Sequence, residues 1–210
     1  MIEPKVIFED DWLIAVDKPP GILVVPTPKK EKHTLTAIVN TYLEKNNPNM
    51  HAYPVHRLDR DTSGIIIYAK DKATQAAIMR LFLERKIKKT YIAFVHGRLK
   101  KMSGLIDNKI PEHDILKSAI TKYQVLKDYS NYVKVLVRPI TGRTNQIRIH
   151  FKQIGHPLVG ERKFAFAKDY SLKFRRVALH AKSIEFVHPV TKRYLFLETE
   201  LTKDLRMLDS

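Results

Sequence analysis

An acidic residue between arginines is the feature of this sequence best suited to chemistry. Residues 56–64 read HRLDRDTSG, which places Asp59 beside Arg60 and two positions after Arg57. Neighbouring guanidinium groups favour the ionised form of a carboxylate, and an ionised carboxylate can act as a nucleophile or as a base. The same residues could instead form a cluster of surface charges at a turn. This segment alone leaves both interpretations open.

A second polar segment follows later in the chain, where residues 141–150 read TGRTNQIRIH. We expect a helix over 145–153 with Thr144 as its N-cap. Arg143 would then lie at the turn before the helix, where it could reach a phosphate group, and Arg148 would lie on the helix itself. A solvated basic start of a helix explains these residues as well, so this segment is also open to two interpretations.

The elements that must position these segments follow from the apolar pattern. Strands are predicted over residues 6–8, 13–16, 65–69, 90–95, 119–126, 132–137, 177–186 and 194–197, with a further short apolar run at 22–25. Helices are predicted over 35–45 with Thr34 as the cap, over 72–86, over 145–153 and from Thr202 onward. Because strands outnumber helices and most can be joined as hairpins, we expect an α+β fold with a mixed, mostly antiparallel sheet and flanking helices. No stretch resembles an interdomain linker, so one catalytic domain over residues 1–210 is expected.

The charge balance indicates a polyanionic partner. The 210 residues include 38 Lys and Arg against 22 Asp and Glu, which gives a net charge of +16. Basic residues are dense at 84–89, 97–101 and 173–176, beside segments predicted as strands. A membrane surface would favour a basic amphipathic helix with bulky apolar residues opposite, so nucleic acid is the better partner. An adaptation for solubility is the alternative explanation of the charge.

Missing residue types exclude other kinds of chemistry. The sequence has no cysteine, which removes disulfides, thiolate nucleophiles and cysteine-based zinc sites. The N-terminal residues MIEPKVIFEDDW lack a basic region followed by an apolar run, so no secretory signal is visible. No apolar stretch approaches the ~18 residues needed to cross a bilayer. We therefore expect a soluble, cytoplasmic protein without a membrane partner.

Five motifs, in the same order along the chain, resemble the RluA family of pseudouridine synthases. They are IFEDDWLIAVDKPPGILVVP at 7–26, HRLD-x-x-TSG at 56–64, KTYIA at 89–93, TGRT-x-QIR-x-H at 141–150 and LHA at 179–181. The resemblance implies a pseudouridine synthase catalytic domain that isomerises uridine to pseudouridine in ribosomal RNA, transfer RNA or both, without a cofactor or a metal ion. It also implies a structured RNA as the partner, a monomer with no obligate protein partner, and the compact form that lacks the N-terminal S4 domain of many family members.

The resemblance assigns roles to individual residues. Asp59 falls on the family's essential aspartate, which acts as nucleophile or base, and Arg148 falls on the arginine that pairs with it. Tyr91 falls on the active-site tyrosine that packs against the uracil. Arg57 falls on an arginine that enters the RNA stack where the target base leaves. The other positions expected to contact RNA are Arg60, Thr62, Arg143 and Asn145.

The chain departs from the family pattern at three positions. Asn145 stands where members commonly have histidine, the usual Gly-Asp pair is Gly160-Glu161, and Phe164 stands where a tyrosine is often found. None of these positions is the inferred acid, arginine or tyrosine. The departures therefore bear on RNA contacts and substrate preference, and not on the reaction.

Two other functions are considered from the residues themselves. Asp59 and Asp61 would point the same way on an extended segment, so they could share the metal ion of a nuclease. The arginines on both sides would repel that cation, and no further cluster of acidic ligands is evident in the sequence. The second alternative is a non-catalytic RNA-binding protein that has kept the fold, and the joint presence of Asp59, Tyr91 and Arg148 argues against it.

Overall fold

The structure divides into two compact units, each assembled from two stretches of the chain. The computed structural model describes residues 3–112, 115–165, 172 and 174–209. Unit 1 contains Met1–Lys88 and Ala181–Glu200, and unit 2 contains Lys89–His180 and Leu201–Ser210. The expectation of one catalytic domain over the whole chain stays a prediction.

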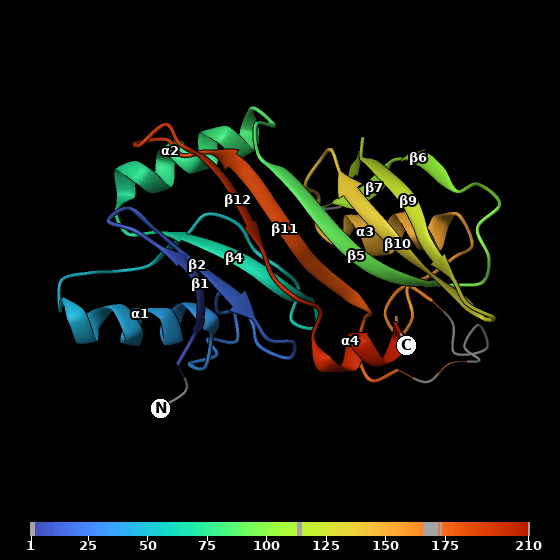
Figure 1. The fold of residues 1–210 in the computed structure, drawn as a ribbon, viewed down its shortest axis with the longest axis horizontal. Coiled ribbons are helices and arrows are strands. Elements are labelled where there is room, and N and C mark those ends of the chain that lie inside the picture. Colours follow the sequence, from blue (N-terminus) through green and yellow to red (C-terminus); the bar gives the residue numbers. More distant parts are fainter. Residues whose placement is uncertain (1–2, 113–114, 166–171, 173, 210) are drawn as a thin grey trace. The chain divides into compact units, whose positions relative to one another are not determined.

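Unit 1 is built on a sheet with two helices beside it (Figure 1). Its strands are β1 (Lys5–Glu9), β2 (Leu13–Lys18), β3 (Tyr53–Pro54), β4 (Ser63–Ala69), β11 (Leu179–Val187) and β12 (Tyr194–Glu198). The strand order is β1-β2-β4-β11, with β3 paired to β4 and β12 paired to β11. The helices are α1 (Leu35–Asn46) and α2 (Lys72–Leu83).

Local sequence explains where the elements of unit 1 begin and how they are buried. Thr34 Oγ1 accepts the backbone N–H of Ala37 at 3.2 Å and caps α1, while Asp71 Oδ1 accepts that of Thr74 at 2.8 Å and caps α2. Strand β4 is buried along its whole length, as expected for an apolar run rich in isoleucine. The core draws on β2, β4, α2, β11 and β12, with Leu13, Ile67, Ile78, Phe186 and Leu197 among its members.

Unit 2 contains a four-stranded antiparallel sheet, a short hairpin and two helices (Figure 1). The strands are β5 (Lys88–His96), β10 (Tyr132–Pro139), β9 (Ile120–Asp128) and β6 (Ser103–Asp107), in the order β5-β10-β9-β6. The hairpin pairs β7 (Ile110–Glu112) with β8 (Ile115–Lys117). The helices are α3 (Gln146–Gln153) and α4 (Lys203–Leu208).

The two helices of unit 2 pack on opposite faces of its sheet. In the strand register Tyr123 of β9 lies opposite Val137 of β10, and the Tyr123 ring contacts Phe151 of α3 with centroids 5.8 Å apart. Side chains one position along each strand point to the other face. On that face Phe94 packs with Leu205 of α4. Helix α3, which carries Arg148, therefore lies on the same face as Tyr123 and Val137.

The predicted α+β fold with a mostly antiparallel sheet and flanking helices is confirmed, including the helix that Thr34 caps. The run at 22–25 is not a strand, and only Leu23 forms an isolated bridge, to Thr34. The helix predicted over 72–86 ends at Leu83, and Arg85 just beyond it has a φ of 57°, which a helix cannot continue. In the parts of the chain described, no helix is long and apolar enough to span a membrane.

Candidate active site

The loop that carries Asp59 connects β3 to β4 and is anchored at its start by His56. The Nε2 atom of His56 accepts the backbone N–H of Ile67 in β4 at 3.1 Å, so the ring proton of the neutral form lies on Nδ1. The imidazole also lies against the ring of Phe82, with centroids 5.3 Å apart. Asp59 itself is half-buried. The His56 side chain therefore accepts a backbone hydrogen bond of β4 that a neighbouring strand would otherwise accept, and it fixes the start of the loop.

The end of the same loop is held by the buried ammonium group of Lys18. This side chain is 0% exposed, and its Nζ donates to the carbonyl oxygens of Pro19 at 3.0 Å, Arg60 at 2.8 Å and Thr62 at 2.7 Å. The Arg60 carbonyl also accepts the backbone N–H of Gly21 at 2.9 Å. An ammonium group has three donors, and three carbonyls are bound here. The backbone on the C-terminal side of Asp59 is thus fixed by a cation from β2.

Gly64 allows the chain to enter β4 directly after this loop. It has a φ of +112°, and a Cβ atom at this position would lie 2.2 Å from the backbone oxygen of Ala181 in β11. No side chain fits in that space, so only glycine can occupy the position. Gly64, the last residue of the TSG part of the motif, therefore allows β11 to lie close to β4.

The other predicted RNA-binding residues of unit 1 differ in exposure. Arg57 is exposed. The Arg60 side chain is 55% exposed, with Nη2 lying 3.5 Å from Glu31 Oε1. Thr62 is buried, and its backbone N–H donates to the Asp59 carbonyl at 3.2 Å. Arg57 and Arg60 are thus accessible to a ligand, whereas Thr62 contributes to the structure of the loop and its contact with RNA stays a prediction.

In unit 2, a buried amide folds the turn that precedes α3. Gln146 Oε1 accepts the Thr141 hydroxyl at 2.6 Å and the backbone N–H of Arg143 at 3.0 Å. Its Nε2 donates to the Ile120 carbonyl at 2.9 Å and to the Thr121 hydroxyl at 2.9 Å. The side chain thus ties the 141–146 turn to β9.

The N-cap of α3 is Asn145 and not Thr144, contrary to the prediction. Asn145 adopts the left-handed conformation, with φ 55° and ψ 18°, and its side chain caps no backbone N–H. Asparagine tolerates this conformation better than most residues. Its Oδ1 instead accepts Nη1 of Arg148 at 2.8 Å, so this predicted RNA-binding residue contacts the predicted catalytic arginine.

Arg148 is further bound by Glu161, a residue to which the sequence assigned no role. Nε donates to Oε2 at 2.7 Å and Nη2 donates to Oε1 at 2.8 Å, which is a two-point ion pair. Gly160, immediately before Glu161, has a φ of +76°, and a Cβ there would lie 1.9 Å from the Arg176 carbonyl oxygen. Glycine is therefore needed at this position for the chain to bring Glu161 to Arg148.

Tyr91 and Arg143 complete the predicted residues of unit 2. Tyr91 lies in β5, is 9% exposed and pairs with Val137 of β10, so its side chain projects on the face that carries α3. Arg143 is half-buried, and its Nη1 lies 3.6 Å from Glu112 Oε2. The Tyr91 and Arg148 side chains thus belong to one face of the unit 2 sheet.

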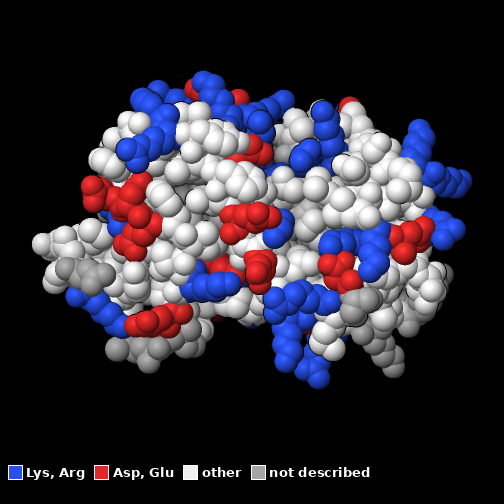
Figure 2. Space-filling model, viewed as in Figure 1, with Lys and Arg blue, Asp and Glu red and all other residues white. Residues whose placement is uncertain are grey.

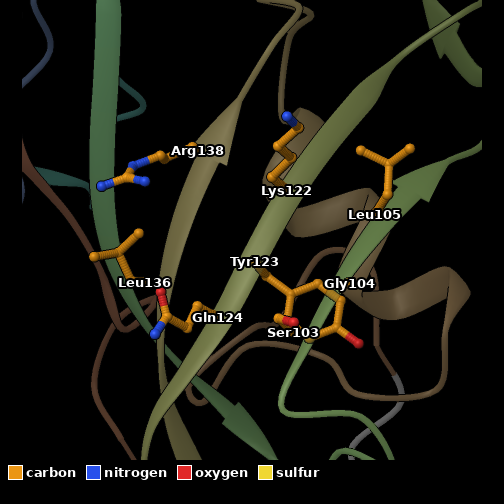
Figure 3. Close-up of a pocket in the computed structure, with 8 residues that line it drawn as sticks. All are labelled: Ser103, Gly104, Leu105, Lys122, Tyr123, Gln124, Leu136 and Arg138. Atoms are coloured by element: carbon orange, nitrogen blue, oxygen red, sulfur yellow. The ribbon is translucent and has the colours of Figure 1, made fainter.

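A groove lies over the same sheet, lined mostly by side chains of its other face. It has a volume of about 420 Å³ and lies over β6, β9 and β10 (Figure 3). Its lining residues are Ser103, Gly104, Leu105, Lys122, Tyr123, Gln124, Leu136 and Arg138. None of the predicted site residues lines this groove. Because Leu136 and Arg138 flank Val137 along β10, their side chains point away from the Tyr91 face.

Surface charge is divided among several groups. On the face drawn in Figure 2, lysine and arginine side chains form separate patches interrupted by acidic and uncharged residues. The net charge of +16 is therefore not collected into one stripe on that face. Within the ranges described, no group of three or more His, Asp or Glu side chains is placed to hold a metal ion. The expectations that the protein needs no metal and no cofactor stay predictions.

The structure brings together the predicted residues within each unit. Arg57, Asp59, Arg60 and Thr62 share one loop in unit 1, and Asn145 contacts Arg148 in unit 2. The predicted pair of Asp59 with Arg148 joins residues of different units and stays a prediction. Sequence reasoning missed Lys18, Gln146 and Glu161. The signals that could have revealed them were a lysine that ends an apolar run, a glutamine inside the TGRT-x-QIR-x-H motif, and the departure at the Gly-Asp pair.

Comparison with known proteins identifies the family. A family model described as RNA pseudouridylate synthase matches residues 12–153. The ribosomal large subunit pseudouridine synthase D of Nitrosomonas europaea is 34% identical over 97% of this chain, which spans only 64% of that relative's length. The dual-specificity RNA pseudouridine synthase RluA of Yersinia pestis is 36% identical, over 88% of this chain and 92% of the relative.

Solved structures share the fold. The human RNA pseudouridylate synthase domain containing 4 superposes with a TM-score of 0.81 at 20% identity, over 96% of this chain and 90% of that one. The corresponding human domain containing 1 gives a TM-score of 0.77 at 22% identity, over 97% and 86%. At these identities the likeness concerns the fold alone. Together with the family model and the relatives above, it shows that this chain belongs to the RNA pseudouridylate synthase family, enzymes that isomerise uridine to pseudouridine in RNA.

Proposed function

We propose that this chain isomerises uridine to pseudouridine in ribosomal RNA, transfer RNA or both, with Asp59 as its catalytic carboxylate. The observation that carries the proposal is the Asp59 loop. It lies inside the segment matched by the family model, and Lys18 and His56 fix its backbone on both sides of a half-buried carboxylate. A carboxylate held on a fixed backbone needs little reorganisation to act on a bound base.

The reaction sets the requirements for the site. The bond between N1 of uracil and C1′ of the ribose breaks, and a bond between C5 and C1′ forms. N1 gains a proton and C5 loses one, so no electron donor, group donor or net hydrolysis is involved. Asp59 can serve in two ways: it attacks C1′ or C6, or it removes a proton from C2′ to give a glycal.

The other predicted residues take supporting roles in this proposal. Arg148 pairs with Asp59 and keeps the carboxylate ionised and oriented. Tyr91 packs against the detached uracil, and its hydroxyl assists loss of the C5 proton. Arg57, which is exposed, enters the space left by the extruded uridine and offsets part of the cost of unstacking, a few kcal/mol.

The substrate is inferred from charge and from the relatives. One relative is named for the ribosomal large subunit and another as a dual-specificity enzyme, and both are about one-third identical to this chain. A net charge of +16 suits binding to the phosphates of a structured RNA, with Arg60, Arg143 and Asn145 among the contacts. We propose that the protein works in the cytoplasm as a monomer without a protein partner.

Release of tritium tests the reaction directly, because formation of the C5 bond expels the C5 hydrogen. The substrate is total RNA labelled with 5-tritiated uridine, taken from cells that lack the gene. The wild-type enzyme should release tritium with EDTA present and leave the RNA uncut on a gel. Asp59→Asn should abolish release while RNA affinity and the melting temperature are kept. Asp61→Asn, two positions away, is the matched control and should stay active.

Two results would overturn the proposal. Full activity of Asp59→Asn would remove the carboxylate from the chemistry. RNA cleavage that EDTA blocks, with equal loss in the Asp59→Asn and Asp61→Asn variants, would instead support a metal-dependent nuclease.

A further inference from the structure

The guanidinium group of Arg148 is held more tightly than an ordinary surface arginine. Its Nε and Nη2 atoms donate to the two oxygens of Glu161 at 2.7 and 2.8 Å. The Arg148 side chain is 12% exposed and that of Glu161 is 0% exposed. A paired geometry of this kind fixes the plane of the guanidinium group as well as its position.

The Glu161 carboxylate also binds the backbone of the residues that follow it. Oε1 accepts the backbone N–H of Lys163 at 2.8 Å and that of Phe164 at 3.3 Å. Burial by itself would raise the pKa of Glu161, but the hydrogen bonds from Arg148 and the Lys163 backbone outweigh burial, so the pKa is lowered. Glu161 is therefore an anion at neutral pH, with an orientation set by its own loop.

Two further contacts restrict Arg148 from other directions. Nη1 donates to Asn145 Oδ1 at 2.8 Å, and the ring centroid of Phe164 lies 5.0 Å from the guanidinium carbon. The left-handed backbone of Asn145 places this amide at the start of α3. All three departures from the family pattern, Asn145, Glu161 and Phe164, thus contact the same arginine.

We propose that Glu161, assisted by Asn145, is a positioning residue that orients Arg148 for the isomerisation. The inference rests on the proposed function, in which Arg148 acts on the catalytic carboxylate. A guanidinium group without its two-point partner would rotate among several rotamers, and a displacement of about 1 Å in a reacting site can cost about 100-fold in rate. The effect should fall on the rate of the bound complex and leave RNA binding in place.

The experiment measures single-turnover tritium release with excess enzyme on the labelled RNA described above. Glu161→Gln keeps the shape of the side chain and removes its charge, and we expect the maximal rate to fall by about 10- to 100-fold. The enzyme concentration at half-maximal rate should stay within about twofold, because RNA binding is not involved. Glu161→Asp keeps a carboxylate and should recover much of the rate.

A double-mutant cycle separates positioning from a merely structural role. If Glu161 acts through Arg148, the Glu161→Gln change should have little further effect on the maximal rate of Arg148→Lys. Asp204→Asn is the matched control, because Arg176 pairs with Asp204 in the same two-point way, at 2.6 and 3.1 Å, within unit 2. This control should lower the melting temperature without changing the maximal rate of the folded enzyme.

The outcomes distinguish the two proposals. A wild-type rate in folded Glu161→Gln, or independent effects of Glu161→Gln and Arg148→Lys, would overturn the positioning role while leaving the proposed function intact. Absence of tritium release from the wild-type enzyme would overturn the proposed function first. If Glu161→Gln does not fold, Asn145→Gly is measured instead. Glycine tolerates the left-handed backbone of residue 145, and the substitution removes only the side-chain amide that binds Arg148. A several-fold loss that disappears on the Arg148→Lys background supports the positioning role, and an unchanged rate overturns it.

Discussion

The Nζ atom of Lys18 donates to the Thr62 carbonyl oxygen at 2.7 Å, in a part of unit 1 where the lysine side chain is fully buried. The two residues are 44 positions apart in the chain. A buried cation is costly unless its donors are satisfied, and the Lys18 ammonium donates to three backbone carbonyl oxygens. The loop that carries Asp59 therefore owes its shape to strand β2, an element outside the loop.

Replacing Lys18 with methionine should destabilise the protein. The substitution removes the ammonium donor from the carbonyl oxygens of Pro19, Arg60 and Thr62, of which Arg60 keeps the Gly21 N–H. Each carbonyl left without a donor should cost about 1–3 kcal/mol. We expect the free energy of unfolding in urea to fall by at least about 2 kcal/mol. Lys5→Met on β1 is the control, because the Lys5 side chain is 70% exposed and its ion pair with Asp17 should be worth about 1 kcal/mol or less. Equal stability of the two variants would contradict this role.

Gly64→Ala tests the close approach of β4 and β11. The added Cβ atom would lie 2.2 Å from the Ala181 backbone oxygen, so the strands must separate and the melting temperature should drop sharply or soluble protein should be lost. Gly21→Ala provides the comparison, since Gly21 has a φ of +88° with no atom within 4 Å of the added Cβ. There we expect only the backbone cost of about 1 kcal/mol. A mild effect at both positions would show that β11 can move aside.

The pair formed by Glu161 and Arg148 should make stability depend on pH in the acidic range. The pKa of Glu161 is lowered in the folded protein from its usual 4.5, because hydrogen bonds outweigh burial. The stabilisation is thus fully present above 4.5 and is lost as the pH falls through the folded pKa. Urea unfolding from about pH 6 to about pH 3 should show the wild type and Glu161→Gln becoming more alike as the pH falls. A constant difference would mean that the carboxylate does not titrate with folding.

Arg57 should contribute to RNA affinity through charge. Its side chain is exposed, and a lost phosphate contact reduces the dependence of log affinity on log salt by about one. Filter binding of the labelled RNA at several salt concentrations should show this decrease for Arg57→Ala. Arg80→Ala, at an exposed position of α2, should leave the slope unchanged. An unchanged slope for Arg57→Ala would contradict a contribution of its charge to RNA binding.

The sequence predicted most accurately those helices and strands that a local cap or apolar pattern marks. The cap at Thr34 with its apolar spacing predicts α1 almost residue for residue, and the isoleucine run predicts β4. Strands β6, β7 and β8 were missed because they are short and mostly exposed, so no alternating pattern marks them. Their pairing depends on partners elsewhere in the chain, which a local pattern does not report.

The candidate site was predictable in its motifs but not in its contacts. Asp59 stands out because it lies among arginines in the motif at 56–64, and Arg148 stands out because it follows Arg143 in the polar motif at 141–150. Nothing near Lys18 reveals that its acceptors are the carbonyls of Arg60 and Thr62, and nothing near Arg148 reveals that Glu161 binds it from 13 positions away. Such contacts are set by tertiary packing, and the sequence shows only the residue types that make them possible.

Both units are discontinuous, because Ala181–Glu200 completes the first and Leu201–Ser210 completes the second. On the ribosome, β4 can pair with β2 and β3 as soon as it is made, but its edge toward β11 stays open until β11 is synthesised more than 100 residues later. Long-range pairing of this kind slows folding and leaves strand edges open in the nascent chain. The enzyme should thus depend on chaperones during synthesis more than a protein of equal length with sequential units.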